Sequence, residues 1–139
     1  MHGADDGHEA DFDVVPARHS SGTVLAVSGE FDLATAPGFA DAVQAELAAP
    51  PAVLVIDLTR TAFADSSACR ELVRAARATS VAGSHLEVVC PTGNVAVRRV
   101  LDLVGLGSVT PLRECLAETA VAQPPVAQSG TPDRVERRA

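Results

Sequence analysis

The segment AVLVIDLTRTAFADSS, residues 52–67, decides the fold class. Its first seven residues are almost continuously apolar, which is typical of a central strand covered on both faces. A short loop over residues 59–64 is predicted next. The Asp-Ser-Ser sequence that follows consists of residue types that favour the N-terminus of a helix. The segment therefore predicts a buried strand that leads into a helix, as in an α/β domain.

Strands and helices alternate on both sides of this segment. The predicted strands cover residues 12–17, 23–28, 52–58 and 85–90. Four helices are predicted. The first begins near Thr35-Ala36-Pro37 and ends before Pro50, and the second covers residues 66–80. The third follows the turn at 91–94 and ends before Gly105, and the fourth covers residues 113–120. Strand–helix–strand units imply parallel pairing, whereas the first two strands are close enough to pair antiparallel. We therefore predict an α/β fold with a mixed sheet of four to five strands and about four helices.

Each of the first three helices carries an apolar face that is predicted to point inward. The members of these faces are Phe39, Val43 and Leu47, then Cys69, Leu72, Val73 and Ala76, and finally Val97, Val100, Leu101 and Val104.

The composition argues for an aliphatic core and against a nucleic-acid partner. The chain has 139 residues, enough for one domain, and 47% of them are apolar. Only 3% are aromatic and the formal net charge is −7, so neither base stacking nor attraction to a polyanion is favoured. The sequence contains no Lys, so its permanently charged basic side chains are all Arg, and a catalytic lysine is excluded.

The two ends of the chain differ from its middle. Residues 1–11 are polar, lack the apolar region of a signal peptide and are expected to be mobile. Residues 123–139 are rich in Pro, Gln, Ser and charge, which predicts a disordered tail. The domain is thus expected over residues 12–122. No apolar run is long enough to span a membrane, so we expect a cytoplasmic protein without a membrane partner.

Common catalytic and metal-binding motifs are missing from the sequence. There is no Gly-rich phosphate loop, GxSxG or HExxH, and the four His and three Cys match no usual ligand set. Asp32, Asp57 and Asp65 could gather at strand ends, but they have no accompanying base, nucleophile or metal, and Asp57 is interpreted as structural. We therefore expect no enzyme activity, no cofactor and no metal.

The serines at the start of the second predicted helix have two interpretations. The simpler one is helix capping, with Asp65 as the N-cap. The functional one depends on spacing, because Ser67, Arg70, Glu71 and Arg74 recur at i, i+3, i+4 and i+7, away from the apolar stripe. A phosphate on Ser67 would meet the positive end of the helix dipole and an arginine.

Three segments in order, VSGEFDLATAP (27–37), AVLVIDLTRTAFADSS (52–67) and PTGNVAVRRVLDLVGLGSVTPL (91–112), resemble the STAS-domain family and, within it, the bacterial anti-sigma factor antagonists. The resemblance covers roughly residues 12–120. It implies a STAS-like fold and partner switching. The unphosphorylated antagonist binds an anti-sigma factor that is also a serine kinase, and this binding releases the sigma factor. The kinase then phosphorylates the antagonist, the complex falls apart, and a serine phosphatase resets the switch.

The resemblance also implies roles for particular residues. Ser67 matches the phosphoacceptor, Asp65 the acid before it, and Asp32 a loop residue next to the partner surface. With Ser66, Arg70 and Arg74, Asp32 and Asp65 form the predicted partner-binding face. The family usually continues Gly-Leu-Gly after the serines, whereas this chain has Ala68-Cys69-Arg70. Either the partner is matched to Arg70, or this chain has lost or changed its phosphorylation.

Two other functions stay open at this point. A STAS domain could act without phosphorylation, as a scaffold or as a subunit of a lipid-transport complex. A small enzyme or nucleotide-binding protein is the second alternative, although the phosphate loop and the catalytic base are missing. The free protein is expected to be a monomer.

Overall fold

A computed structural model of the protein describes residues 12–122. The expectations of a mobile segment at 1–11 and a disordered tail at 123–139 lie outside these residues. The described elements are β1 (Asp13–His19), β2 (Gly22–Phe31), α2 (Ala36–Leu47), β3 (Val53–Ala64), α3 (Ser66–Val81), β4 (His85–Val89), α4 (Val95–Leu103), the 3-10 turn η1 (Leu106–Ser108), β5 (Leu112–Arg113) and the 3-10 turn η2 (Leu116–Glu118).

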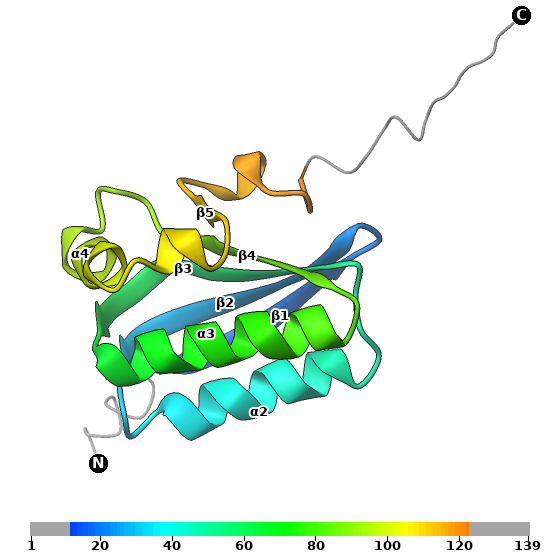
Figure 1. The fold of residues 1–139 in the computed structure, drawn as a ribbon, viewed down its shortest axis with the longest axis horizontal. Helices are drawn as coiled ribbons and strands as arrows, with labels where there is room; N and C mark the ends of the chain where they lie inside the picture. Colours follow the sequence, from blue (N-terminus) through cyan, green and yellow to red (C-terminus); the bar gives the residue numbers. More distant parts are fainter. Residues whose placement is uncertain (1–11, 123–139) are drawn as a thin grey trace, which may run out of the picture.

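The predicted mixed sheet is confirmed. Its five strands lie in the order β1-β2-β3-β4-β5, with β1 antiparallel to β2 and all other neighbours parallel. Helices α2 and α3 lie side by side across one face of the sheet, and α4 packs against β3 and contacts α3 (Figure 1). The main core lies between this face and the helices. It includes Phe31, Phe39, Leu54, Ile56, Leu72 and Leu101.

The opposite face of the sheet carries a second, smaller apolar cluster. It consists of Val24, Val53, Val55 and Val89, and the C-terminal residues Ala120 and Val121 pack against it. Because successive side chains of a strand point to opposite faces, the apolar run in β3 supplies both clusters. The prediction of a central strand covered on both faces is therefore confirmed.

Strand β3 is longer than the sequence pattern predicts, and the predicted loop over residues 59–64 is wrong. These residues continue the strand and pair with the second half of β2, across register shifts at Ala26/Ser28 and Gly29/Glu30. The buried Thr61 hydroxyl donates a hydrogen bond of 2.8 Å to the Val27 carbonyl. Polar residues in this half of the strand obscured the pattern, because its backbone pairing does not require apolar side chains.

The predicted helix over residues 113–120 is also wrong. Leu112 and Arg113 instead form β5 beside Val88 and Val89, and only the short turn η2 follows. The Glu114 carboxylate accepts a hydrogen bond from the Thr92 backbone N–H at 3.0 Å. These long-range partners outweigh the weak helical pattern. The described part of the chain thus has three α-helices and two 3-10 turns rather than about four helices.

The third predicted apolar face is confirmed for Val97 and Leu101, which are buried, while Val100 is half-buried against the core. Val104 does not point inward, because α4 ends at Leu103 and Val104 is half exposed. Gly105 has a φ of 72°, the left-handed conformation expected for a residue that stops a helix.

Candidate partner-binding site

The carboxyl ends of β2 and β3 meet the start of α3 at one edge of the molecule. Phe31 and Ala64, the last residues of these strands, lie opposite each other. The Asp65 backbone N–H donates to the Phe31 carbonyl at 3.3 Å, which ties the two chain segments together. Asp32 follows Phe31 directly. The structure therefore brings the predicted residues Asp32 and Asp65 to the same edge.

Asp32 belongs to a short loop that is held by side-chain hydrogen bonds. The Thr35 backbone N–H donates to the Asp32 carboxylate at 3.1 Å, and the Asp32 N–H donates to the Thr35 hydroxyl at 2.9 Å. The same hydroxyl donates to the Glu30 carbonyl at 2.9 Å. This reciprocal pair is typical of Asp and Thr in turns, and it fixes the entry to α2.

Asp65 is the N-cap of α3, as the sequence predicts. Its carboxylate accepts hydrogen bonds from the backbone N–H groups of Ser67 at 2.9 Å and Ala68 at 3.1 Å. These amides lie in the first turn, where they have no partner within the helix. The capping interpretation is therefore confirmed for Asp65, and the carboxylate is fixed next to both serines.

The two serines differ in exposure. Ser66 is exposed and Ser67 is half-buried, so the expected outward orientation of Ser67 is met only in part. A phosphate on Ser67 would lie at the positive end of the α3 dipole, but also beside the Asp65 carboxylate. Two like charges would then compete for the same backbone amides. Such a modification would change the electrostatics of this edge strongly.

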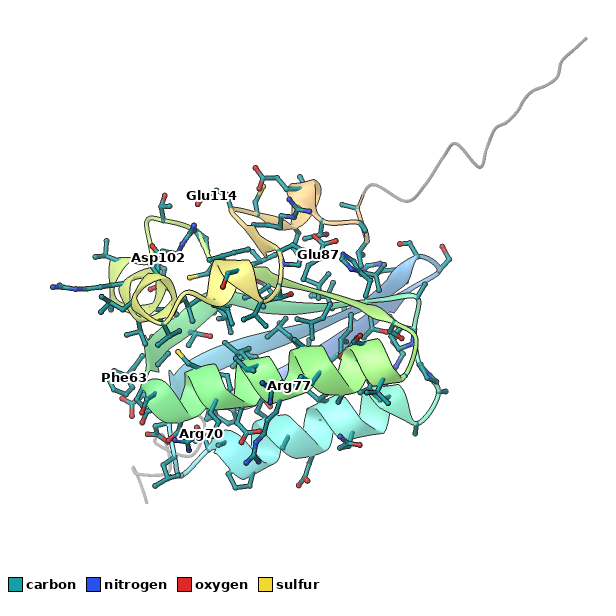
Figure 2. The ribbon with its side chains drawn as sticks, in the orientation of Figure 1. Phe63, Arg70, Arg77, Glu87, Asp102 and Glu114 are labelled. Carbon is teal, nitrogen blue, oxygen red and sulfur yellow. The ribbon has the colours of Figure 1, made fainter. Side chains whose placement is uncertain are left out.

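Arg70 and Arg74 are exposed on α3, and Arg70 lies near the start of the helix (Figure 2). Arg74 approaches the Glu71 carboxylate at 3.7 Å, whereas Arg70 has no ion-pair partner within residues 12–122. Of the Ala68-Cys69-Arg70 sequence, Ala68 and Cys69 are 0% and 4% exposed and face the core. The departure from the family pattern therefore reaches the surface only at Arg70.

Two exposed apolar side chains at this edge were missed from the sequence. Leu33 is 71% exposed in the loop after β2, and Phe63 is 47% exposed near the end of β3, where it lies opposite Glu30. Phe63 appears beside the start of α3 in Figure 2. An apolar residue between Asp32 and Ala34 was the available signal for Leu33. No comparable signal was available for Phe63, because residues 59–64 were interpreted as a loop.

The third aspartate of the possible cluster lies elsewhere. Asp57 is in register with Ala26 and Val89, in the middle of the sheet and well before the edge at Ala64. Its carboxylate accepts a hydrogen bond from the Thr59 backbone N–H at 3.0 Å. The interpretation of Asp57 as a structural residue agrees with this position.

No metal-binding cluster is found in the described part of the chain, and its two buried thiols have raised pKa values. No group of three or more His, Cys, Asp or Glu residues there could hold a metal ion. Burial raises the pKa of the Cys90 thiol to about 11, and burial together with the Asp65 charge raises the pKa of Cys69. Across residues 12–122, no helix has the length and apolarity needed to cross a membrane.

Two of the hollows that lie against helices α2, α3 and α4 are outside the serine edge. One, of about 160 Å³, lies between α2 and α3, and another, of about 450 Å³, lies over α4. Neither is lined by Asp32, Asp65 or Ser67. What the edge itself offers is a polar and apolar contact surface, with a serine at a helix N-terminus and an arginine one turn further on.

Comparisons with known proteins agree with this description. Residues 14–114 match the family described as "Mlab, STAS domain". The crystal structure of an anti-sigma factor antagonist from Mycobacterium paratuberculosis is similar to the chain, with 33% sequence identity and a TM-score of 0.71. The match covers 80% of this chain and 94% of that one. No curated protein sequence matches the chain.

More distant structures share the fold. The Bacillus cell fate determinant SpoIIAA in its phosphorylated form has 17% identity and a TM-score of 0.60, over 81% of this chain and 97% of that one. The anti-sigma factor antagonist SpoIIAA in its unphosphorylated form has 15% identity and a TM-score of 0.59, over 81% of this chain and 96% of that one.

The chain belongs to the STAS-domain family of anti-sigma factor antagonists.

Proposed function

We propose that the chain is a non-enzymatic anti-sigma factor antagonist that works by partner switching. Its unphosphorylated form binds an anti-sigma factor that is also a serine kinase, and phosphorylation of Ser67 ends that binding. The observation that carries the proposal is the edge at the start of α3, where the Ser67 backbone N–H donates a hydrogen bond to the carboxylate of the Asp65 cap. The similarity to the antagonist from Mycobacterium paratuberculosis supports the same function.

The contact surface combines apolar and polar groups in a way that suits a protein partner. Leu33 and Phe63 offer exposed apolar area at this edge, and Asp32 and Ser66 add polar groups to it. An apolar centre with a polar rim is typical of protein interfaces. The partners under this proposal are the anti-sigma kinase and a serine phosphatase in the cytoplasm, with neither nucleic acid nor membrane involved.

Phosphorylation would weaken the complex through charge and desolvation. A phosphate adds a charge of about −1.5 to −2 at neutral pH and must lose water in an interface. Arg70 is close enough in sequence, one turn further along α3, to reach it. Because Arg70 is exposed, such a pair would contribute roughly 1 kcal/mol or less, so it would not neutralise the effect of the phosphate.

The experiment is to incubate the purified chain with its cognate anti-sigma factor and ATP, and to locate the phosphate by mass spectrometry. We expect one phosphate, on Ser67, and none on the Ser67→Ala variant. Ser66→Ala is the matched control and should be phosphorylated normally. A phosphate on Ser66 would contradict the proposed site. A stable complex without any phosphate transfer would favour the non-phosphorylated scaffold instead.

A further inference from the structure

Three arginines form a row along the exposed face of α3. Arg70, Arg74 and Arg77 are spaced by four and three residues, so they lie on one side of the helix, and all three are exposed. Figure 2 shows Arg70 near the start of α3 and Arg77 further along the same helix. At 1.5 Å per residue, the row extends for about 10 Å along the helix axis. It begins one turn after Ser67.

The row is largely unpaired, in contrast to Arg98 and Arg113 elsewhere in the domain. Arg98 and Arg113 hold carboxylates at 2.9 Å. Within residues 12–122, Arg70 and Arg77 have no ion-pair partner, and Arg74 has only Glu71 at 3.7 Å. Glu71 is also the only acidic residue in the sequence of α3. The helix thus presents three guanidinium groups and one carboxylate, a local excess of two positive charges.

We propose that this arginine row binds an acidic segment of the anti-sigma factor, next to the Ser67 edge. The inference depends on the proposed function, because it names the chemistry of the same partner. Carboxylates repeated at one-turn intervals on a partner helix would match the spacing of the row. The row would fix the orientation of the complex and increase its association rate, while the apolar side chains at the edge supply affinity.

The net charge of the chain favours a locally acidic protein over an extended polyanion. The full chain carries −7, so a nucleic acid or an anionic membrane is repelled at distances beyond the row itself. A protein partner needs an acidic patch only where the row makes contact. The row begins one turn after Ser67, at the edge where Leu33 and Phe63 are exposed, so one protein partner can contact both.

The hollow beside the row fits this occupant better than a small ligand. It lies between α2 and α3, with Arg74 and Glu71 among its lining residues and Phe39, Val43, Ala75 and Ala78 supplying apolar atoms. Its volume of about 160 Å³ is below the roughly 300 Å³ at which small-molecule sites usually begin. A single side chain from the acidic segment can enter it while its carboxylates meet the row.

The row also explains how a phosphate could act over the whole helix face. The excess of two positive charges on the arginine face is already reduced by the Asp65 carboxylate at the helix N-terminus, and the −1.5 to −2 of a phosphate on Ser67 would cancel the rest. Phosphorylation would then remove the long-range attraction for the acidic segment as well as the close contact at the serine. Partner release and slower rebinding would result from one modification.

The test is the association rate of the purified anti-sigma factor with the full chain, measured by surface plasmon resonance from 50 mM to 1 M NaCl. We expect Arg77→Glu to lower the rate about tenfold or more at low salt, and to flatten its salt dependence. Arg99→Glu is the matched control, since Arg99 is exposed on α4 and has no ion-pair partner within residues 12–122. Its rate should stay within about twofold of wild type. Circular dichroism would confirm that both variants are folded.

Equal rates for Arg77→Glu and Arg99→Glu would overturn the proposal. If the wild type binds and phosphorylation of Ser67 releases it, such a result would leave the proposed function intact. If the wild type does not bind the anti-sigma factor, both the function and the inference fail. Sedimentation with phosphatidylglycerol vesicles tests the other anionic surface. Arg77-dependent sedimentation, together with an unchanged association rate for the protein partner, would assign the row to a membrane and overturn the inference.

Discussion

Asp65 connects the fold to the candidate site at the scale of a single residue. Its carboxylate caps α3 through the Ser67 and Ala68 amides, and its own N–H binds the end of β2. The same residue therefore holds the helix N-terminus, the strand end and the serines in one arrangement. A change at Asp65 should affect stability and partner binding together.

We predict that Asp65→Ala lowers the free energy of unfolding by about 1 kcal/mol, the usual effect of losing an N-cap. Asp65→Asn should keep most of the stability, because Asn is a comparable cap without the charge. Urea denaturation followed by circular dichroism measures both. Equal stability of Asp65→Ala and wild type would show that the cap contributes little.

Capping was predictable from the sequence because it depends on residues that are close in the chain. Asp followed by two serines at the end of an apolar run is sufficient evidence for a helix start. The half-buried position of Ser67 and the exposure of Phe63 were not predictable in this way. Both depend on how α3 packs and where β3 ends, which are set by contacts between distant segments.

At the scale of elements, the C-terminal segment is held to the sheet by one buried carboxylate. Glu87, on β4, is 1% exposed and is labelled in Figure 2. It accepts hydrogen bonds from Arg113 at 2.9 Å and from the Ala120 N–H at 3.1 Å, and it lies 3.1 Å from the His85 ring. Burial raises the pKa of this carboxyl, but Arg113, the Ala120 N–H and the His85 charge together hold the pKa below its usual value.

We predict that Glu87→Gln destabilises the domain by about 1–3 kcal/mol at pH 7. The reason is that Arg113 and the Ala120 N–H would then face a neutral amide in place of the buried carboxylate. A lowered pKa stabilises the folded state at pH values above the unfolded pKa of about 4.3. That contribution is lost as the pH falls through the folded pKa. The difference in Tm between wild type and variant should therefore shrink from pH 7 to pH 3. A constant difference over this range would contradict the role of the ionised carboxylate.

The strands and helices with the clearest apolar periodicity were the ones that could be predicted from the sequence. Helices α2 and α3 and the first half of β3 carry strong patterns, and the structure has them close to the predicted positions. The segment after Pro111 carries a weak pattern, and pairing with β4 and hydrogen bonds to Glu87 determine its conformation. These partners lie some 25 residues away in the sequence, where local propensity gives no information.

At the scale of the whole molecule, the sheet needs cover on both faces, and the two covers differ. Helices α2 and α3 shield the larger core, whereas Ala120 and Val121 shield the smaller cluster. The Ser21 hydroxyl donates to the Val121 carbonyl at 2.6 Å and holds this cover at its end. Ala120 and Val121 therefore pack on the sheet.

We predict that a chain ending at Ala122 keeps nearly the Tm of the full chain and still binds its partner, because the composition of residues 123–139 supports no buried core. A chain ending at Cys115 loses Ala120, Val121 and their hydrogen bonds, and should be less stable by about 1–3 kcal/mol. Differential scanning calorimetry compares the two. A large drop in Tm for the chain ending at Ala122 would show that the tail docks on the domain.

The fold class was predictable at this scale because alternating strands and helices with short connections allow few topologies. The resemblance of three ordered segments narrowed the fold further, to a STAS domain. The strand order was not predictable in this way, because it depends on which strands pair and in which register. The residues that cover the second face of the sheet were also missed, because their segment was expected to be a helix.

The central claim is that a phosphate on Ser67 controls binding of an anti-sigma factor. Isothermal titration calorimetry with the purified anti-sigma factor tests it most directly, with the chain unphosphorylated and then stoichiometrically phosphorylated on Ser67. We expect tight binding of the first form and a Kd at least about 100-fold higher for the second, a difference of about 2.7 kcal/mol. Equal affinity of the two forms would contradict it.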